Sequence, residues 1–352
     1  MPYNASEERT PGTAEEMAPA ESGSGPETAP RSARPTSPVR IAAAVAVGLV
    51  VLQLLMVTLF AWPGARSEPR DLPIAVAGAP AEASALADRL ERAHPGAFTV
   101  HAVADEAAAR ARIEDRRDYG AIVLGPAGPR LLTASAASAT VAQSLPRYVA
   151  AVHEGRPVPV VDVVPAPADD PRGAGLGGAV LPLVMTGMFS GIFLTLFVPR
   201  LRLRLAGAAL FAALGGLAAT GLLQGWVGAL SGPYAVDAGA VALLLLAVNL
   251  PIIGLAAVLG RPGIVLGAVT MFLIGNPLSG ATSAPELLPQ PWGTLGRLLP
   301  PGAGGNLLRS TAFFDGNGAG GHLVVLGAWI ALGAVLSAAS GLGLGLGRTR
   351  AA

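Results

Sequence analysis

Residues 41–62 read IAAAVAVGLVVLQLLMVTLFAW, an uncharged run that is long enough to cross a bilayer as one helix. Arg40 directly precedes this run, and Trp62 ends it with the kind of aromatic side chain that gathers at the membrane–water interface. Further apolar runs lie at residues 178–198, 205–227, 238–259, 263–274 and 322–346. The run at 263–274 is shorter than the other runs and can extend into the segment that follows it. The sequence therefore predicts an α-helical polytopic membrane protein with six transmembrane helices.

The composition excludes several classes of protein. Charged residues make up 13% of the 352-residue chain, whereas soluble domains carry about 25%. The chain has no cysteine, which excludes disulfides, thiolate metal sites and cysteine nucleophiles. It also has no lysine, so it cannot complete a P-loop for ATP hydrolysis. The net charge of +1 gives no reason to expect a nucleic-acid partner. The many Gly, Pro and Ala residues are typical of a high-GC bacterial genome.

Two regions outside the apolar runs differ in character. Residues 1–40 are polar and rich in Glu, Pro and Ser, which predicts a disordered cytoplasmic tail. Residues 63–175 alternate between strand-like and helix-like patterns, and Pro146 is expected to end or kink the last helix. We expect strands at 72–77, 98–103, 119–124, 131–133 and 158–164, and helices at 81–94, 105–118 and 138–153. This order predicts an α/β domain with a mostly parallel sheet, inserted between transmembrane helices 1 and 2.

The arginines next to the apolar runs predict the topology, because basic residues concentrate on the cytoplasmic side. With six helices they all fall on one side of a bacterial plasma membrane, so both termini, including residues 347–352, are expected in the cytoplasm. The α/β domain, the loop at 231–237 and the segment at 275–321 are then extracellular. The arginines concerned are Arg40, Arg200, Arg202, Arg204, Arg261, Arg348 and Arg350.

Residues 275–316, between the last two apolar runs, are too rich in Pro and Gly to form one helix. We expect short helices broken at Pro277, Pro285, Pro289, Pro291 and Pro300-Pro301. The segment is predicted to be either an extracellular gate or a structural cap that seals the bundle. Trp292 is expected at the interface, and Glu286, Arg297, Arg309 and Asp315 are expected to face water or to pair. The candidate residues of this outer segment are Asn276, Pro277, Glu286, Trp292, Pro300, Pro301 and Arg309.

The runs, as bounded above, contain no ionisable residue in their interiors, which argues against a proton-driven transporter. Gln224 and Asn249 are candidates for helix packing or for a substrate pathway, and Pro251 predicts a kink with a freed carbonyl group. Glycines 341, 343, 345 and 347 favour close helix packing, within the subunit or across a homodimer. The G-x-G-x-x-G run at 173–178 opens a membrane span, so we interpret it as a hinge with close packing rather than a dinucleotide site.

Two local patterns stand out: RDYGAIVL (117–124), and the outer segment's GNPLSG (275–280) with LPPG (299–302) and LLR (307–309). These patterns resemble ABC-2 type transporter permeases, and within them the phage-infection-protein branch. The order of one span, an outer α/β insert, five more spans and a Pro/Gly-rich segment before the last span supports the resemblance. The resemblance implies a permease subunit that forms a homodimer and is driven by a separate P-loop ATPase. That ATPase is expected to dock on the cytoplasmic face, where Arg200, Arg202 and Arg204 are candidate contacts.

The cargo expected for such a permease is an apolar or amphipathic compound, because a bundle without charge in the membrane suits lipid-like molecules better than ions. The alternative is a non-transporting membrane scaffold or receptor whose extracellular domain binds a partner or envelope component. We expect no enzyme, no cofactor and no metal, because the sequence has no catalytic motif and its four His residues lack metal-ligand spacing.

Overall fold

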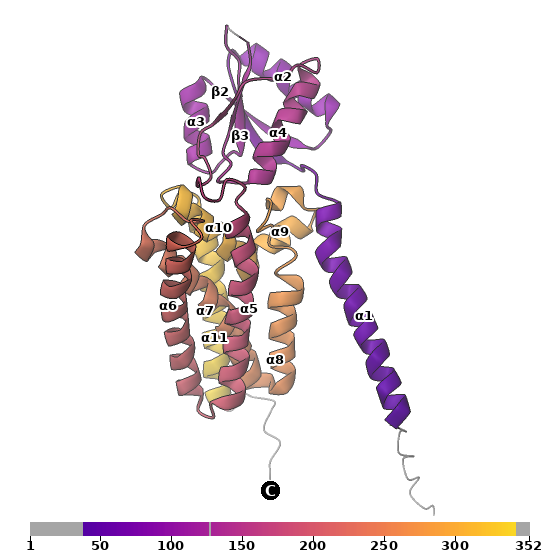
Figure 1. Cartoon of the computed structure of the whole chain (residues 1–352), viewed down its shortest axis with the longest axis vertical. Helices are drawn as coiled ribbons and strands as arrows, with labels where there is room; N and C mark the ends of the chain where they lie inside the picture. Colours follow the sequence, from indigo (N-terminus) through magenta and orange to yellow (C-terminus); the bar gives the residue numbers. More distant parts are fainter. Residues whose placement is uncertain (1–37, 127, 343–352) are drawn as a thin grey trace, which may run out of the picture. The chain divides into compact units, whose positions relative to one another are not determined.

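The computed structural model describes residues 38–126 and 128–342 (Figure 1). The chain divides into two compact units, Met1–Val51 and Leu52–Ala352, and the helix α1 (Pro38–Ala65) contains the boundary between them. The second unit holds a helical bundle and a sheet with its covering helices. Of the predicted tail at residues 1–40, residues 38–40 belong to α1 and residues 1–37 lie outside the described residues. Also outside them lie Arg348, Arg350 and the glycines at 343, 345 and 347.

Five helices in the described part of the chain are long and apolar enough to cross a membrane. They are α1, α5 (Ala174–Phe197), α6 (Leu201–Gly225), α7 (Tyr234–Leu259) and α11 (Ala319–Gly341). The run predicted at 263–274 forms the shorter α8 (Arg261–Ala268), which continues as one π-helical segment, η1 (Val269–Ile274). The end of η1 is followed by Gly275 and Pro277. Gly275 is tightly packed, since a β-carbon there would lie 2.8 Å from the Met271 carbonyl oxygen.

The helix α7 starts earlier than the sequence suggested, and this overturns one expectation. Pro233 precedes the first turn, so Tyr234 begins the helix and Asp237 falls within it. The Asp237 side chain is fully buried, so the span does carry an ionisable group. A carboxylate is favourable in a first turn because of the helix dipole, which explains how the polar residue belongs to the helix and not to the preceding loop.

The helix α7 is the centre of the bundle. Of its apolar stretch 61% is buried inside the protein, against 33% for α5, 22% for α6 and 17% for α11. Small residues let the neighbouring helices approach it closely: a β-carbon on Gly216 of α6 would lie 2.5 Å from the Ala238 carbonyl oxygen. Likewise, a β-carbon on Gly333 of α11 would lie 2.5 Å from the Leu250 carbonyl carbon. A β-carbon on Gly341, by contrast, would lie within 4 Å of no atom in the described part of the chain.

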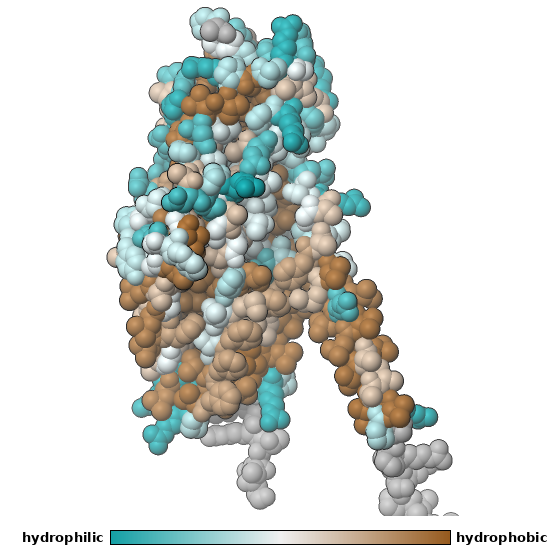
Figure 2. All heavy atoms as spheres, viewed as in Figure 1, coloured by the Kyte–Doolittle hydropathy of each residue, from teal (hydrophilic) through white to brown (hydrophobic). Residues whose placement is uncertain are grey.

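The successive bundle helices α5, α6, α7 and α8–η1 run in alternating directions (Figure 1). This alternation puts Arg200, Arg202, Arg204 and Arg261 at one end of the bundle, while the sheet lies at the other end. Figure 2 shows brown, hydrophobic side chains over the bundle helices and teal, hydrophilic ones over the sheet region. Exposed apolar residues such as Phe193, Phe197 and Leu210 contribute to the apolar outside of the bundle.

A five-stranded sheet lies between α1 and α5 in the sequence, with strand order β2-β1-β3-β4-β5. The pair β3–β4 is antiparallel and the other three pairs are parallel. The predicted strands and helices of this region are confirmed, with boundaries that shift by a few residues. The strands are β1 (Leu72–Ala77), β2 (Phe98–Val103), β3 (Gly120–Val123), β4 (Arg130–Thr133) and β5 (Val160–Asp162), and the helices are α2 (Pro80–Ala93), α3 (Glu106–Glu114) and α4 (Ala139–Val152).

Alternate residues of the strands fill two cores, one on each face of the sheet. The first core includes Ile74 and Leu90 and is covered by α2 and α4; the second includes Ala75 and Ile113 and is covered by α3. Of the two outcomes expected at Pro146, an end or a kink, the end is wrong, since α4 continues to Val152. Buried Leu145 and Val149 on either side of the proline anchor both halves of α4, which offsets the lost backbone hydrogen bond.

The segment after η1 contains the short elements η2 (Pro285–Leu287), α9 (Trp292–Arg297) and α10 (Pro300–Phe313). Short helices separated at prolines are therefore confirmed, but Pro300 and Pro301 begin α10 instead of breaking a helix. Proline suits that position because the first N–H groups of a helix have no partner within it. The helix α10 is buried along most of its length and packs against α7, α11 and α5.

Candidate functional site

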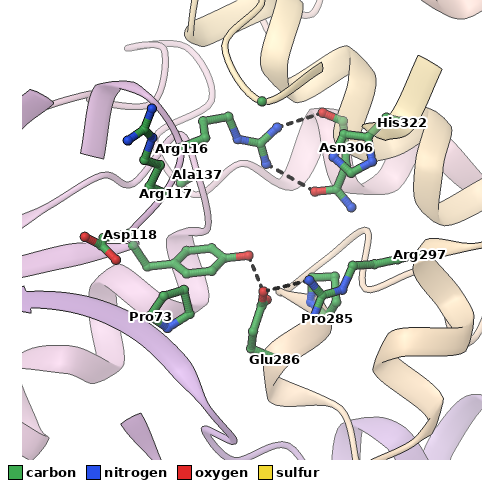
Figure 3. Close-up of a pocket in the computed structure, with 12 residues that line it drawn as sticks. Pro73, Arg116, Arg117, Asp118, Ala137, Pro285, Glu286, Arg297, Asn306 and His322 are labelled. Atoms are coloured by element: carbon green, nitrogen blue, oxygen red, sulfur yellow. Dashed lines mark hydrogen bonds and ion pairs between the residues drawn. The ribbon is translucent and has the colours of Figure 1, made fainter. Parts of the chain in front are cut away.

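A cavity of about 220 Å³ lies where the sheet meets the outer segment and the start of α11. Its lining combines residues far apart in the sequence, and most of the polar ones are drawn in Figure 3. The lining residues are Pro73, Arg116, Arg117, Asp118, Tyr119, Ala137, Pro285, Glu286, Arg297, Asn306, Gly318 and His322. This junction, which we call the junction cavity, is the main candidate site.

Arg116 extends from the end of α3 across the junction to α10 (Figure 3). Its Nη1 donates to the backbone oxygen of Asn306 at 2.9 Å and to the Ser310 hydroxyl, and its Nη2 donates to Asn306 Oδ1 at 3.2 Å. The guanidinium carbon also lies 5.3 Å from the centre of the Phe314 ring, within cation–π range. Burial lowers the pKa of Arg116 below its ordinary value. These contacts connect the sheet region directly to the bundle.

A second polar connection crosses the junction beside the first. The Tyr119 hydroxyl, just before β3, donates to Glu286 Oε2 at 2.8 Å. The other carboxylate oxygen of Glu286 lies 3.5 Å from Arg297 Nη1, as Figure 3 shows. Burial and the negative charge of Glu286 raise the pKa of Tyr119 far above its usual range, so the phenol stays protonated and remains a donor. The expectation that Glu286 pairs with Arg297 is confirmed, although Glu286 is buried.

Arg309 lies behind the junction cavity, on the α10 turn next to Asn306. Its Nη2 donates to the Ala281 backbone oxygen at 3.0 Å, and its Nη1 lies 3.5 Å from the same Asn306 Oδ1 that Arg116 contacts. Arg309 is therefore buried, and it pairs with no carboxylate among the described residues. The expectation that it faces water or pairs with a charged residue of the outer segment is wrong for this part of the chain. Burial, aided by repulsion from Arg116, lowers the pKa of Arg309 to about 10.

The other predicted residues of the outer segment lie elsewhere. Asn276 is buried and Pro277 follows it, and both line a separate hollow of about 460 Å³ beside the N-terminal end of α5. The Trp292 ring is partly exposed and meets the Trp62 ring edge to face, with ring centres 6.5 Å apart. Pro300 and Pro301 are buried in the first turn of α10. The structure thus brings Glu286 and Arg309 to the junction and leaves the rest of the predicted set around it.

The predicted pathway residues occupy two separate places in the bundle. Gln224 Nε2 donates to Asp237 Oδ2 and to the Gly232 oxygen, both at 2.9 Å. Asn249 lies on α7, about 18 Å along that helix from Asp237, given a rise of about 1.5 Å per residue. Its Nδ2 donates to Ser190 Oγ at 3.2 Å. Pro251, beside it, does not end α7, and Gly333 of α11 packs against the backbone there.

The candidate cytoplasmic contacts lie at the end of the bundle away from the sheet. Arg200 is the residue before α6, and Arg202 and Arg204 lie in its first turns. Arg204 Nε donates to the Val198 backbone oxygen at 2.6 Å, which fixes the turn between α5 and α6.

The glycine run at 173–178 packs closely, as predicted. A β-carbon on Gly175 would lie 2.7 Å from Ala229, and one on Gly177 would lie 3.2 Å from the Ala281 oxygen. Asp170 Oδ2 accepts from the Gly175 backbone N–H at 2.9 Å at the start of α5. The carboxylate of Asp170 occupies the place that an anionic phosphate takes in a nucleotide-binding helix, which supports the packing interpretation.

Sequence reasoning did not single out the residues that complete the junction. Arg116, Tyr119 and Asn306 are ordinary surface types in the sequence, and His322 was expected only at a surface or interface. Arg116 has a positive φ of 57°, which places its side chain out of line with α3. A charged turn directly after a helix and before a buried strand was the one available signal, since such a turn lies at the end of the sheet.

Comparison with known proteins found no family model, curated protein or solved structure that matches this chain. The five apolar helices are those of a helical protein that could cross a membrane several times.

Proposed function

We propose that this chain is the permease subunit of an ABC-2 type exporter in the bacterial plasma membrane. It moves an apolar or amphipathic compound, with energy from a separate P-loop ATPase. In this proposal the chain crosses the membrane six times, the sheet region is extracellular and both termini are cytoplasmic. The helix at 261–274 is then the fifth crossing, although its length of about 21 Å is shorter than the hydrocarbon core of about 30 Å. Residues 275–280, covered by α10, complete that crossing, since irregular backbone at membrane depth needs protein cover.

One observation carries the proposal: α10 connects the sheet region to the centre of the bundle. Arg116 and Tyr119 of the sheet region bind the outer segment, and α10 packs on α7 and α5. A movement of α7 or α5 therefore reaches the sheet region through few, defined contacts. Such a linkage is what an exporter needs if the energy enters at one end of the bundle and the outer gate opens at the other.

A non-transporting scaffold or receptor remains the alternative, and the packing of α7 favours it. Glycines on α6 and α11 let their backbones touch α7, and such backbone contacts hold helices rigidly. A rigid bundle suits an anchor for an outer binding domain better than it suits a channel that must open.

The test is co-purification of the full chain from its native membrane, in mild detergent, followed by identification of any ATPase. We expect a P-loop ATPase that is lost when Arg200, Arg202 and Arg204 are all changed to Gln. The matched control changes three exposed arginines of the sheet region to Gln, namely Arg89, Arg92 and Arg156, and should retain the partner. If no ATPase accompanies the wild-type chain and gene deletion changes no compound's efflux, the exporter proposal fails and the scaffold is favoured.

A further inference from the structure

The junction contains more positive charge than its carboxylates balance. Among the described residues, neither Arg116 nor Arg309 forms an ion pair with a carboxylate, and Arg297 shares Glu286 with Tyr119. Arg309 is buried and Arg116 is partly buried, and this burial lowers the pKa of both arginines. This arrangement of arginines lacks a negative partner. Burying a charge without a counter-charge costs free energy, so binding an anion here would be favourable.

The second carboxylate in the lining does not supply that partner. Asp118 Oδ1 lies 2.7 Å from His101 Nδ1 and 3.2 Å from Arg112 Nη2, and Arg112 Nε also contacts Oδ2. Both of its oxygens are therefore occupied on the sheet side of the junction. Arg117, also in the lining, is largely exposed, and its Nε lies 3.6 Å from Asp115 Oδ2. Glu286 is thus the carboxylate that faces Arg116 and Arg297.

The junction cavity offers room and a free donor. Its volume of about 220 Å³ exceeds that of several water molecules, each of which occupies about 30 Å³ in the liquid. Arg297 Nε is buried and has no hydrogen-bond partner among the described residues. Figure 3 shows Arg116 and Arg297 on different sides of the labelled group, with Glu286 beside Arg297. His322 of α11 and Asn306 add polar atoms to the same lining.

We propose that the junction cavity binds an oxyanion, the phosphate or carboxylate group of a small or amphipathic molecule, between Arg116 and Arg297. Guanidinium groups match these planar or tetrahedral oxygens in geometry and charge, and each supplies several N–H donors. The unpartnered Nε of Arg297 is a free donor for such a group, and Arg116 supplies a second positive charge in the same lining. The proposal does not depend on export, because binding takes place on the isolated chain.

The oxyanion has two possible sources, which the experiment separates. A free phosphate ion uses only the polar lining. An amphipathic phosphate also places an alkyl chain against apolar residues of the adjoining bundle, so it binds more tightly than the free ion.

The experiment is isothermal titration of the purified full chain, reconstituted in neutral phosphatidylcholine nanodiscs, with inorganic phosphate and with hexyl phosphate. Hexyl glucoside serves as the uncharged probe. The first variant is Arg297→Gln, which removes the positive charge and replaces the guanidinium group by an amide on a shorter side chain. We expect it to weaken phosphate and hexyl phosphate binding by about tenfold or more. Arg156→Gln is the matched control, because Arg156 is an exposed arginine of the sheet region and its loss should leave both affinities unchanged.

Glu286→Gln is the second variant. It is expected to strengthen binding, so it tests the proposal even if Arg297→Gln fails to fold. The amide oxygen still accepts from Tyr119, while the competing negative charge disappears, so affinity for both anions should rise by about tenfold.

Tighter binding of hexyl phosphate than of inorganic phosphate identifies an amphipathic ligand, and equal binding identifies the free ion. The proposal is overturned if the wild-type chain binds neither anion, or binds hexyl glucoside equally well. It is also overturned if Arg297→Gln and Arg156→Gln have the same effect.

Discussion

The guanidinium group of Arg116 contacts Asn306 at two atoms, the backbone oxygen at 2.9 Å and the side-chain Oδ1 at 3.2 Å. Because Oδ1 also lies 3.5 Å from Arg309 Nη1, one amide oxygen serves two cations, of which Arg309 is buried and Arg116 partly buried. Asn306→Ala removes this shared acceptor, and we expect it to lower the free energy of unfolding by about 1–3 kcal/mol. Thermal unfolding of the purified chain measures this loss.

Asn306→Asp is the matched variant. Like the Ala variant it loses the hydrogen bond from Asn306 Nδ2 to the Gly302 oxygen, but it keeps the shape of the side chain and adds the missing negative charge between the two arginines. We expect it to unfold at a temperature equal to or above that of the wild type. If Asp at this position destabilises the chain as much as Ala does, the two arginines are not short of negative charge.

The close contact between α6 and α7 gives a prediction about packing. A β-carbon on Gly216 would lie 2.5 Å from the Ala238 oxygen, so Gly216→Ala forces the helices apart. We expect a destabilisation of about 1–3 kcal/mol, measured by thermal unfolding in detergent. Gly239→Ala is the control, because a β-carbon there meets nothing within 4 Å and alanine favours the helix. Equal stability of the two variants would show that the α6–α7 contact is looser than described.

Arg309 gives a prediction about pH. Burial lowers its pKa to about 10 in the folded chain, well below the ordinary value that it has in the unfolded chain. Between these values the unfolded chain binds more protons than the folded one, so stability rises with pH. Below pH 10 both states are protonated, and the full cost of burying the charge applies.

Arg309→Met removes this titration and serves as the reference. Above pH 10, the free energy of unfolding of the wild type, relative to Arg309→Met, should rise by at most about 1.4 kcal/mol per pH unit. Unfolding measured for both chains between pH 8 and 11 tests this slope. A difference that stays constant over that range contradicts it.

The start of α10 distinguishes a gate from a structural cap. Replacing Pro300-Pro301 with Ala-Ala keeps residues that favour a helix but removes the fixed backbone of its first turn. If the outer segment is a gate, export should fall while thermal unfolding stays close to that of the wild type. Intact folding with unchanged export would exclude the gate and leave the cap.

The sequence predicts local elements well because each has its own periodic pattern. Residues 72–77 and 98–103 form strands at the predicted bounds, and the apolar runs form helices. The start of α7 was misplaced because Asp237 is polar in the sequence and buried only through its neighbours. The contact of Arg116 with Asn306 could not be foreseen, since it joins residues 190 positions apart and depends on how the sheet region packs on the bundle.

The two cores of the sheet are not built from the sheet region alone. Ala284 and Leu287 belong to the core under α2 and α4, and Phe314 belongs to the core under α3. During synthesis the five strands therefore emerge long before the residues that complete their cores. The sheet region reaches its final packing only after α5, α6 and α7 have been made. A fragment restricted to residues 66–172 leaves apolar surface uncovered, so we expect it to aggregate when expressed on its own.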